Sequence, residues 1–200
     1  MQIQKYEEKE QWLASRRGKI TGTRLKDIVV KRGTGKKIGF YELIAERLGI
    51  PADDENVMER GIRLEQEAIK EFEKETKKKV NTDLVILTRD DNEYIAISPD
   101  GLIGKKEAVE VKCLSSARHI EAFLTQQIPS DYEYQVLQYF IVNDTLNTLY
   151  FVFYDPRIIV KPFFYLIINR KEVQKEVEQY LEYQRKTLEE VNEIVNNLTY

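Results

Sequence analysis

Hydrophobic and polar positions change their spacing along the chain, and these changes divide it into helical and strand-rich parts. Segment 7–16 has a helical pattern, and a second helix is predicted at 40–48, where Gly49-Ile50-Pro51 ends it. A third helix is predicted at about 56–76, and its apolar residues share one helix face: Leu64, Ala68, Ile69 and Phe72. The first third of the chain is therefore predicted to be mainly helical.

The middle of the chain adopts the two-residue period of β-strands. Segments 82–89 and 93–98 are predicted strands, with a turn at Asp90-Asp91-Asn92 between them. Segment 107–113 alternates sides, which places Glu110 and Lys112 on one face of a strand. The elements predicted next are a helix at 131–142 and strands at 147–154 and 162–168.

The chain closes with a predicted helix at about 170–198. Its apolar residues recur at nearly helical spacing, as expected of one buried seam: Val173, Val177, Leu181, Leu188, Val191 and Val195. No internal repeat, low-complexity tract or linker interrupts the chain, so residues 1–200 are predicted to form a single domain. The order of elements predicts a mixed α/β fold, with a central mixed sheet flanked by helices.

Composition excludes several classes of protein. With 42% hydrophobic and 32% charged residues, the chain has the make-up of an ordinary globular protein. Its one cysteine, Cys113, cannot form an intramolecular disulfide or a four-cysteine metal site, and it suits a reducing compartment. The polar N-terminus is unlike a signal peptide, and no apolar run approaches the roughly 20 residues that span a bilayer. A cytoplasmic protein without a membrane segment is expected.

The strongest chemical signal is SPDGLIGKKEAVEVKC at 98–113. Asp100 follows one predicted strand, and Glu110 and Lys112 share a face of the next, where Asp100 can join them. Facing carboxylates repel each other unless a divalent cation neutralises them, and oxygen ligands suit Mg²⁺ or Mn²⁺. Lys112 could then orient or deprotonate a water and offset developing charge. The alternative is that Asp100-Gly101 is only a turn and Glu110 and Lys112 a surface pair.

Two helical segments add to this signal. The segment RGIRLEQEA at 60–68 carries Gly61 and then Glu65, and YEYQVLQYF at 132–140 carries Gln135 and Tyr139 one turn apart. Each segment alone could be a solvated helix face. Together with Asp100, Glu110 and Lys112 they follow the motif order of one nuclease superfamily.

The chain resembles the lambda-exonuclease, or viral recombinase, branch of the PD-(D/E)xK superfamily, whose core is like that of restriction endonucleases. The resemblance runs from Trp12 to about Arg170. It is carried by W-x-x-x-R-x-G-x-I-T-x-T (Trp12 to Thr23), G-x-x-x-E (Gly61 to Glu65), SPDGL, EVKC, YQVLQY and YDPR.

The resemblance implies a role for each matching residue. Asp100, Glu110 and Glu65 would hold Mg²⁺, with the Val111 carbonyl as a further ligand. Lys112 would be the catalytic lysine, and Gln135 would position the water or the lysine. Glu67 lies near this site in the sequence, but it does not fall on the motif position.

The resemblance also implies a pocket for the 5′-phosphate of a DNA end. The matching positions are Arg16, Thr23, Ser98 and Arg118, and guanidinium groups bind phosphate oxygens well. Both arginines could equally be ordinary surface residues. Met58 matches an apolar wedge that splits the terminal base pair, although a Met in a helix core is the alternative.

A formal net charge of −3 lacks the basic signature of proteins that coat nucleic acid, so contacts with DNA must be local. The basic stretch with Lys31, Arg32, Lys36 and Lys37 could follow a duplex backbone or be a mobile loop. Acidic metal ligands lower the sequence charge, and bound cations would restore a positive potential.

The implied function is Mg²⁺-dependent 5′→3′ digestion of one strand of duplex DNA, which releases 5′-mononucleotides and leaves 3′ single-stranded tails for recombination. The resemblance also implies a ring-shaped homotrimer and a single-strand annealing protein as partner, both encoded by a phage or prophage. Two alternatives stay open: an endonuclease of the same superfamily, and a non-catalytic protein that binds DNA ends.

Overall fold

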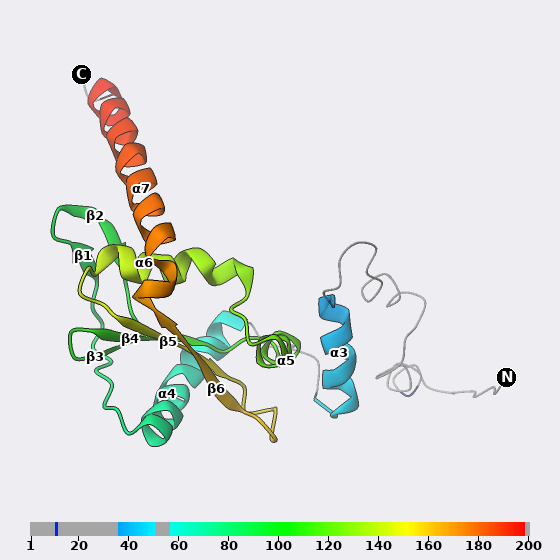
Figure 1. Cartoon of the computed structure of the whole chain (residues 1–200). Coiled ribbons are helices and arrows are strands. Elements are labelled where there is room, and N and C mark those ends of the chain that lie inside the picture. Colours follow the sequence, from blue (N-terminus) through cyan, green and yellow to red (C-terminus); the bar gives the residue numbers. More distant parts are fainter. Residues whose placement is uncertain (1–10, 12–35, 51–56, 199–200) are drawn as a thin grey trace.

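A four-stranded sheet with helices on both faces forms the centre of the chain (Figure 1). The structure is a computed structural model, and it describes residue 11 and residues 36–50 and 57–198. The helices are α3 (Ile38–Arg47), α4 (Val57–Thr76), α5 (Ser116–Thr125), α6 (Glu133–Val142) and α7 (Arg170–Leu198), with a short 3-10 helix, η1 (Ser130–Tyr132). The strands are β1 (Leu87–Arg89), β2 (Asn92–Ile97), β3 (Gly101–Ile103), β4 (Glu107–Lys112), β5 (Thr148–Tyr154) and β6 (Phe163–Asn169).

The main sheet is mixed, as predicted. Its strand order is β3-β4-β5-β6, and only the central pair, β4 and β5, runs parallel. A parallel pair needs a long crossover, and here α5, η1 and α6 provide it. The register of this pair sets Glu110 beside Phe151 and Lys112 beside Phe153.

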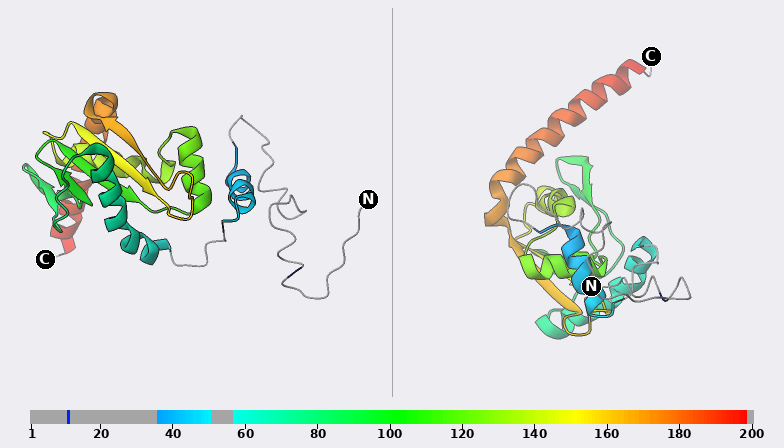
Figure 2. Two further views of the ribbon diagram at one scale, coloured as in Figure 1. Left: turned by 90° about the horizontal axis from the view of Figure 1, so that it is seen from below. Right: turned by 90° about the vertical axis from the view of Figure 1, so that its right-hand side faces the viewer.

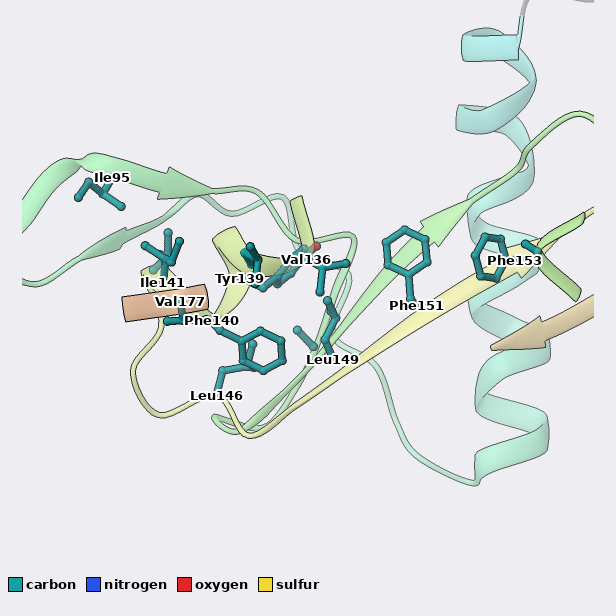
Figure 3. Packing of buried hydrophobic residues seen from close by; sticks show 14 of the residues in the cluster. Ile95, Val136, Tyr139, Phe140, Ile141, Leu146, Leu149, Phe151, Phe153 and Val177 are labelled. Carbon is teal, nitrogen blue, oxygen red and sulfur yellow. The ribbon is translucent and has the colours of Figure 1, made fainter. Parts of the chain in front are cut away.

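Strand β5 explains why helices cover both faces, because its residues alternate between two apolar clusters. Leu149, Phe151 and Phe153 are buried toward α6 and α7, among the residues that Figure 3 shows. Tyr150, Val152 and Tyr154 point the other way and pack against α4. A strand that is buried on both faces reads as a continuous apolar run, and β5 has the sequence TLYFVFY.

Helix α7 packs against α6 and β6, and its C-terminal turns leave the body of the molecule, as Figures 1 and 2 show from three sides. Val177 of the predicted seam is buried, and Val173, Leu181 and Leu188 are partly buried against the same cluster. The side chains of Val191 and Val195 lie outside the described part of the chain. No helix of the described residues is long and apolar enough to cross a membrane.

The prediction of the two strands before Asp100 was partly wrong. Residues 82–86 are not in a strand. Leu84 and Ile86 are 103% and 74% exposed, so their apolar side chains are not buried against a sheet. Strands β1 and β2 form a small separate sheet and do not pair with β4. The antiparallel partner of β4 is β3, which was not predicted because it is only three residues long.

Helix α5 was also missed. Its buried side chains include Ser116 and His119, and these polar residues weaken the apolar pattern of the helix. Ser115 caps it by accepting a hydrogen bond from the backbone N–H of Arg118 at 3.4 Å. The predicted helix at 7–16 lies outside the described residues except for Gln11.

Candidate active site

Five of the residues singled out in the sequence meet at one end of the main sheet. Asp100 directly precedes β3, and Glu110 and Lys112 lie on β4. Glu65 comes from α4 and Gln135 from α6. All but Gln135 line a single pocket, whose walls are Glu65, Asp100, Glu110, Val111, Lys112, Cys113, Leu114 and Tyr132. The pocket is therefore built by the two strands and closed from the side by α4 and η1.

Glu110 is held by three donors. Its side chain is only 2% exposed, and its Oε1 accepts hydrogen bonds from Lys112 Nζ at 2.5 Å and Gln135 Nε2 at 2.6 Å. The hydroxyl of Tyr139 donates to its Oε2. A carboxylate can be buried only when its charge is compensated and its lone pairs are satisfied, and these three donors meet both conditions.

Tyr139 remains a donor over the whole physiological range. Burial, the Glu110 charge and the hydrogen bond to Glu110 raise the pKa of the Tyr139 phenol far above its ordinary value of 10.0. Its position one helical turn after Gln135 directs both side chains at the same carboxylate. The sequence contained this signal, the spacing Q-x-x-x-Y, but Tyr139 was not among the predicted site residues.

The surroundings of Asp100 oppose its ionisation. Its Oδ2 accepts a hydrogen bond from the Val111 N–H at 2.7 Å. Burial, then repulsion from Glu110 and Glu65, raise its pKa to about 7, against the lowering effect of that hydrogen bond and of Lys112. Burial and Glu110 also raise the pKa of Glu65. The pocket thus carries more negative charge than its own cations compensate.

Lys112 lies between a carboxylate and an aromatic ring. Its ammonium group pairs with Glu110 and lies 4.8 Å from the centre of the Tyr132 ring. Tyr132 comes from η1 and its ring is 6.0 Å from that of Phe151 on β5. A cation over a ring face is attracted by the ring quadrupole, so the ring gives Lys112 a second partner. Tyr132 was not predicted as a site residue.

The donor set of the pocket fits a hard divalent cation. Glu65, Asp100, Glu110 and Val111 all line it, and the ligand atoms that they can offer a cation are oxygens. Within the described residues, however, no three Asp, Glu, His or Cys side chains already form a group that could hold an ion. Both oxygens of Glu110 accept hydrogen bonds, from Lys112, Gln135 and Tyr139. A carboxylate has about four lone pairs, so these three donors leave one for a further ligand.

Two of the four predicted 5′-phosphate residues, Ser98 and Arg118, lie in the described part of the chain. Arg16 and Thr23 lie outside the described residues. Ser98 is exposed and donates to the Val85 carbonyl at 3.0 Å. Arg118, in the first turn of α5, pairs with Asp131 at 2.6 Å. Ser98 and Arg118 therefore have different partners.

Four other residues from the sequence can be placed in part. Met58 lies in the first turn of α4, but its side chain is outside the described part. Glu67 is exposed and accepts a hydrogen bond from the Tyr154 hydroxyl at 3.2 Å, and it is not among the residues that line the pocket. Cys113 is buried among the apolar residues of the α4 side, as expected of a packed thiol. Lys36 lies over the Phe40 ring, at 5.3 Å from its centre.

Comparison with known proteins adds independent findings. A family model described as a YqaJ-like viral recombinase domain matches residues 11–146. Among curated proteins, no match to the chain was found.

Solved structures of exonucleases share the fold. The alkaline exonuclease LHK-Exo from Laribacter hongkongensis is 27% identical, with a TM-score of 0.57, and the alignment covers 94% of this chain and 99% of that one. Its complex with dAMP gives 28% identity and a TM-score of 0.56, with the same coverage. A phage-related exonuclease from Haemophilus somnus 129PT aligns at 14% identity and a TM-score of 0.48, over 86% of this chain and 94% of that one.

Proposed function

The chain belongs to the YqaJ-like viral recombinase family and is a nuclease of that family, and on this premise we propose that it is a Mg²⁺-dependent 5′→3′ exonuclease of duplex DNA. The observation that carries the proposal is the buried Glu110, held beside Asp100, Glu65 and Lys112 in one pocket. A surface ion pair or a simple turn would not need three donors around one buried carboxylate.

Glu65, Asp100, Glu110 and the Val111 carbonyl are proposed as the ligands of Mg²⁺, with Mn²⁺ as a possible substitute. When bound, such an ion polarises a phosphate and lowers the pKa of a water toward neutrality. The excess negative charge that raises the pKa of Asp100 to about 7 supports this proposal, because a divalent cation would offset it.

Lys112 and Gln135 are proposed to act on the reacting groups. Both bind the same oxygen of Glu110, so a change at Glu110 on substrate binding reaches both of them. The ammonium of Lys112 would orient the attacking water and stabilise the charge that develops on the phosphate. The amide of Gln135 would fix the position of the water or of Lys112.

The finer parts of the proposal rest on the family. The products would be 5′-mononucleotides and duplexes with 3′ single-stranded tails, and a mononucleotide in the LHK-Exo complex with dAMP supports the first of these. Arg16, Thr23, Ser98 and Arg118 are proposed to bind the 5′-phosphate of the end, and Met58 to part the terminal base pair. A homotrimeric ring and a single-strand annealing partner of phage origin complete the proposal.

The proposal is tested by digestion of a linear duplex that carries a 5′-phosphate on one strand only. We expect 5′-mononucleotides with Mg²⁺, none with EDTA, and preference for the phosphorylated strand. Lys112→Ala should reduce the rate by about 10²- to 10³-fold, as loss of a group that stabilises the transition state does. Lys175→Ala on the exposed face of α7 is the matched control and should digest as the wild type does.

Other products would point to the alternatives. Internal cuts, or equal cutting of circular DNA, would leave the metal site in place and replace exonuclease by endonuclease. Binding of DNA ends without any cleavage in Mg²⁺ or Mn²⁺ would favour a non-catalytic end-binding protein.

A further inference from the structure

Lysines gather at the end of the main sheet that is far from the pocket. Lys77, Lys78 and Lys79 follow α4, and Lys105 and Lys106 form the turn between β3 and β4. Four of the five are exposed, and Lys78 is partly buried. We call this group the lysine cluster. In a chain of net charge −3, five cations in two short segments are a clear departure from the average.

Backbone pairing brings the two segments together. Asn81 and Leu102 form an antiparallel bridge, with backbone hydrogen bonds of 2.8 Å in both directions. Lys78 pairs with Glu107 at 2.7 Å and lies 5.5 Å from the centre of the Tyr150 ring. Figure 1 shows the chain running from the end of α4 past the β3–β4 turn. The cluster is therefore a feature of the fold and not only of the sequence.

Four of these cations are not used by the fold. Within the described part of the chain, Lys77, Lys79, Lys105 and Lys106 make no ion pair. Lys78 neutralises Glu107, and Lys74 neutralises Glu71 at the preceding turn of α4. Like charges that lie close together repel, so an exposed group of this kind gains free energy when it binds an anion.

The cluster lies at a defined distance from the candidate active site. Strand β4 runs from Glu107, next to the cluster, to Lys112, in the pocket. At roughly 3.3 Å per residue the strand separates them by about 17 Å. Phosphates of one DNA strand follow each other at about 3.4 Å, so the cluster is about five nucleotides from the pocket.

We propose that the lysine cluster binds the phosphate backbone of DNA several nucleotides away from the bond that is cut. The proposal rests on the proposed function, since it takes DNA as the substrate. Lysine is a flexible point charge that suits backbone phosphates without fixed geometry. An acidic protein partner fits less well, because no large hydrophobic side chain is exposed at 76–81 or 103–107, and protein interfaces usually have an apolar centre.

The test compares Lys79→Gln/Lys105→Gln/Lys106→Gln with a control of equal charge change, Lys171→Gln/Lys175→Gln/Lys186→Gln on α7. Lys77 and Lys78 are kept, because Lys77 ends α4 with a φ of 59° and Lys78 bonds to Glu107. Binding of a 5′-phosphorylated duplex of about 20 base pairs is followed by fluorescence anisotropy in EDTA over a range of salt. Each lost phosphate contact should lower the slope of log K against log salt by about 0.9.

We expect the cluster variant to lose a slope of about 2 to 3 and at least about tenfold in affinity at 0.1 M salt, and the α7 control to change little. A duplex with an added 3′ single-stranded tail shows which strand the cluster binds. If the cluster binds the tail, the tail increases the affinity of the wild type and not that of the cluster variant.

Equal slopes for the cluster variant and the α7 control would overturn the proposal. Binding is measured without divalent ions, so this result does not depend on whether the protein cleaves DNA. The two proposals can also fail separately. If the cluster variant binds DNA weakly but the wild type digests no duplex, the cluster still binds DNA and the proposed exonuclease activity is wrong.

Discussion

Asp100 and Glu110 are two carboxylates of one pocket with different surroundings. Glu110 has three side-chain donors, whereas the one hydrogen bond that Asp100 accepts from the described residues comes from the Val111 N–H. Because burial and Glu110 oppose its ionisation, the pKa of Asp100 rises to about 7, and the folded protein holds its proton more tightly than the unfolded chain does.

This difference predicts a pH dependence of stability in the absence of divalent ions. Between about pH 4 and pH 7 the unfolded chain gives up the Asp100 proton and the folded protein keeps it, so the free energy of unfolding falls as the pH rises. Asp100→Asn removes this loss and should stabilise the protein at pH 8 by on the order of 2 kcal/mol, with little effect at pH 4. Urea unfolding in EDTA at both pH values measures it. A variant less stable than the wild type at pH 8 would show that the Asp100 charge is well compensated.

Tyr132 offers a second prediction at this scale. Its ring lies under the Lys112 ammonium at 4.8 Å, so it can hold the lysine when Glu110 is engaged elsewhere. Tyr132→Leu should lower kcat about tenfold with little change in KM, whereas Tyr132→Phe should keep most of the activity because the ring remains. Steady-state digestion of a linear duplex measures both. Equal losses in the two variants would mean that the hydroxyl matters and not the ring.

The candidate site could be predicted only where the spacing of residues along one helix or strand determines the direction of their side chains. Alternation along β4 placed Glu110 and Lys112 on one face, and they form an ion pair. Tyr132 reaches the pocket from a three-residue 3-10 turn, and such a turn has no period from which the direction of a side chain could be predicted. Tyr139 was visible in its helical spacing, but its partner lies 29 residues away in the sequence.

Elements were predicted where their apolar pattern was long. The long helices α4 and α7 and the strands β5 and β6 lie close to the predicted ranges. Strand β3 has three residues, and its first, Gly101, lets the Val80 side chain pack close to the backbone: a Cβ there would lie 2.3 Å from Val80 Cγ1. Helix α5 was missed because its buried polar residues have tertiary partners, such as Asp155 for Ser116.

Asp155 joins α5 to the loop after β5. It is fully buried and accepts hydrogen bonds from Ser116 Oγ at 2.5 Å and from Arg157 Nε at 2.8 Å. Burial alone would raise its pKa, but the hydrogen bonds from Arg157 and Ser116 outweigh it and lower the pKa below the ordinary value of 3.8. The ionised form is therefore the one that stabilises the folded protein.

We expect Asp155→Asn to lower the free energy of unfolding at pH 7 by on the order of 3 kcal/mol, because it breaks a buried ion pair. The sign of the pH effect is the reverse of that for Asp100. The contribution is present above about pH 4 and disappears as the pH falls through the lowered pKa of the folded state, so wild type and variant should converge in acid. Urea unfolding at pH 7 and at pH 3 measures the difference, and a cost that stays constant with pH would contradict this account.

The whole molecule separates its charges along the main sheet. One end carries Glu65, Asp100 and Glu110, and the other carries the lysine cluster. DNA that meets this surface is attracted at one end and repelled at the other as long as the carboxylates are not neutralised. The net charge of −3 is thus compatible with binding DNA, provided that a divalent cation neutralises the carboxylates of the pocket.

This separation predicts how carboxylates affect DNA affinity. In EDTA, Glu65→Gln/Asp100→Asn should bind a 5′-phosphorylated duplex more tightly than the wild type, although it lacks two proposed ligands. At about 1 kcal/mol for a charge pair 4 Å apart in water, each neutralised carboxylate is worth up to about fivefold. Added Ca²⁺ should strengthen binding by the wild type and have little effect on the variant. Fluorescence anisotropy measures both, and the control Glu176→Gln/Glu178→Gln on the exposed face of α7 makes the same change in net charge. If the double variant binds more weakly than the wild type in EDTA, the two carboxylates accept hydrogen bonds from donor groups of the DNA, and repulsion does not determine the affinity.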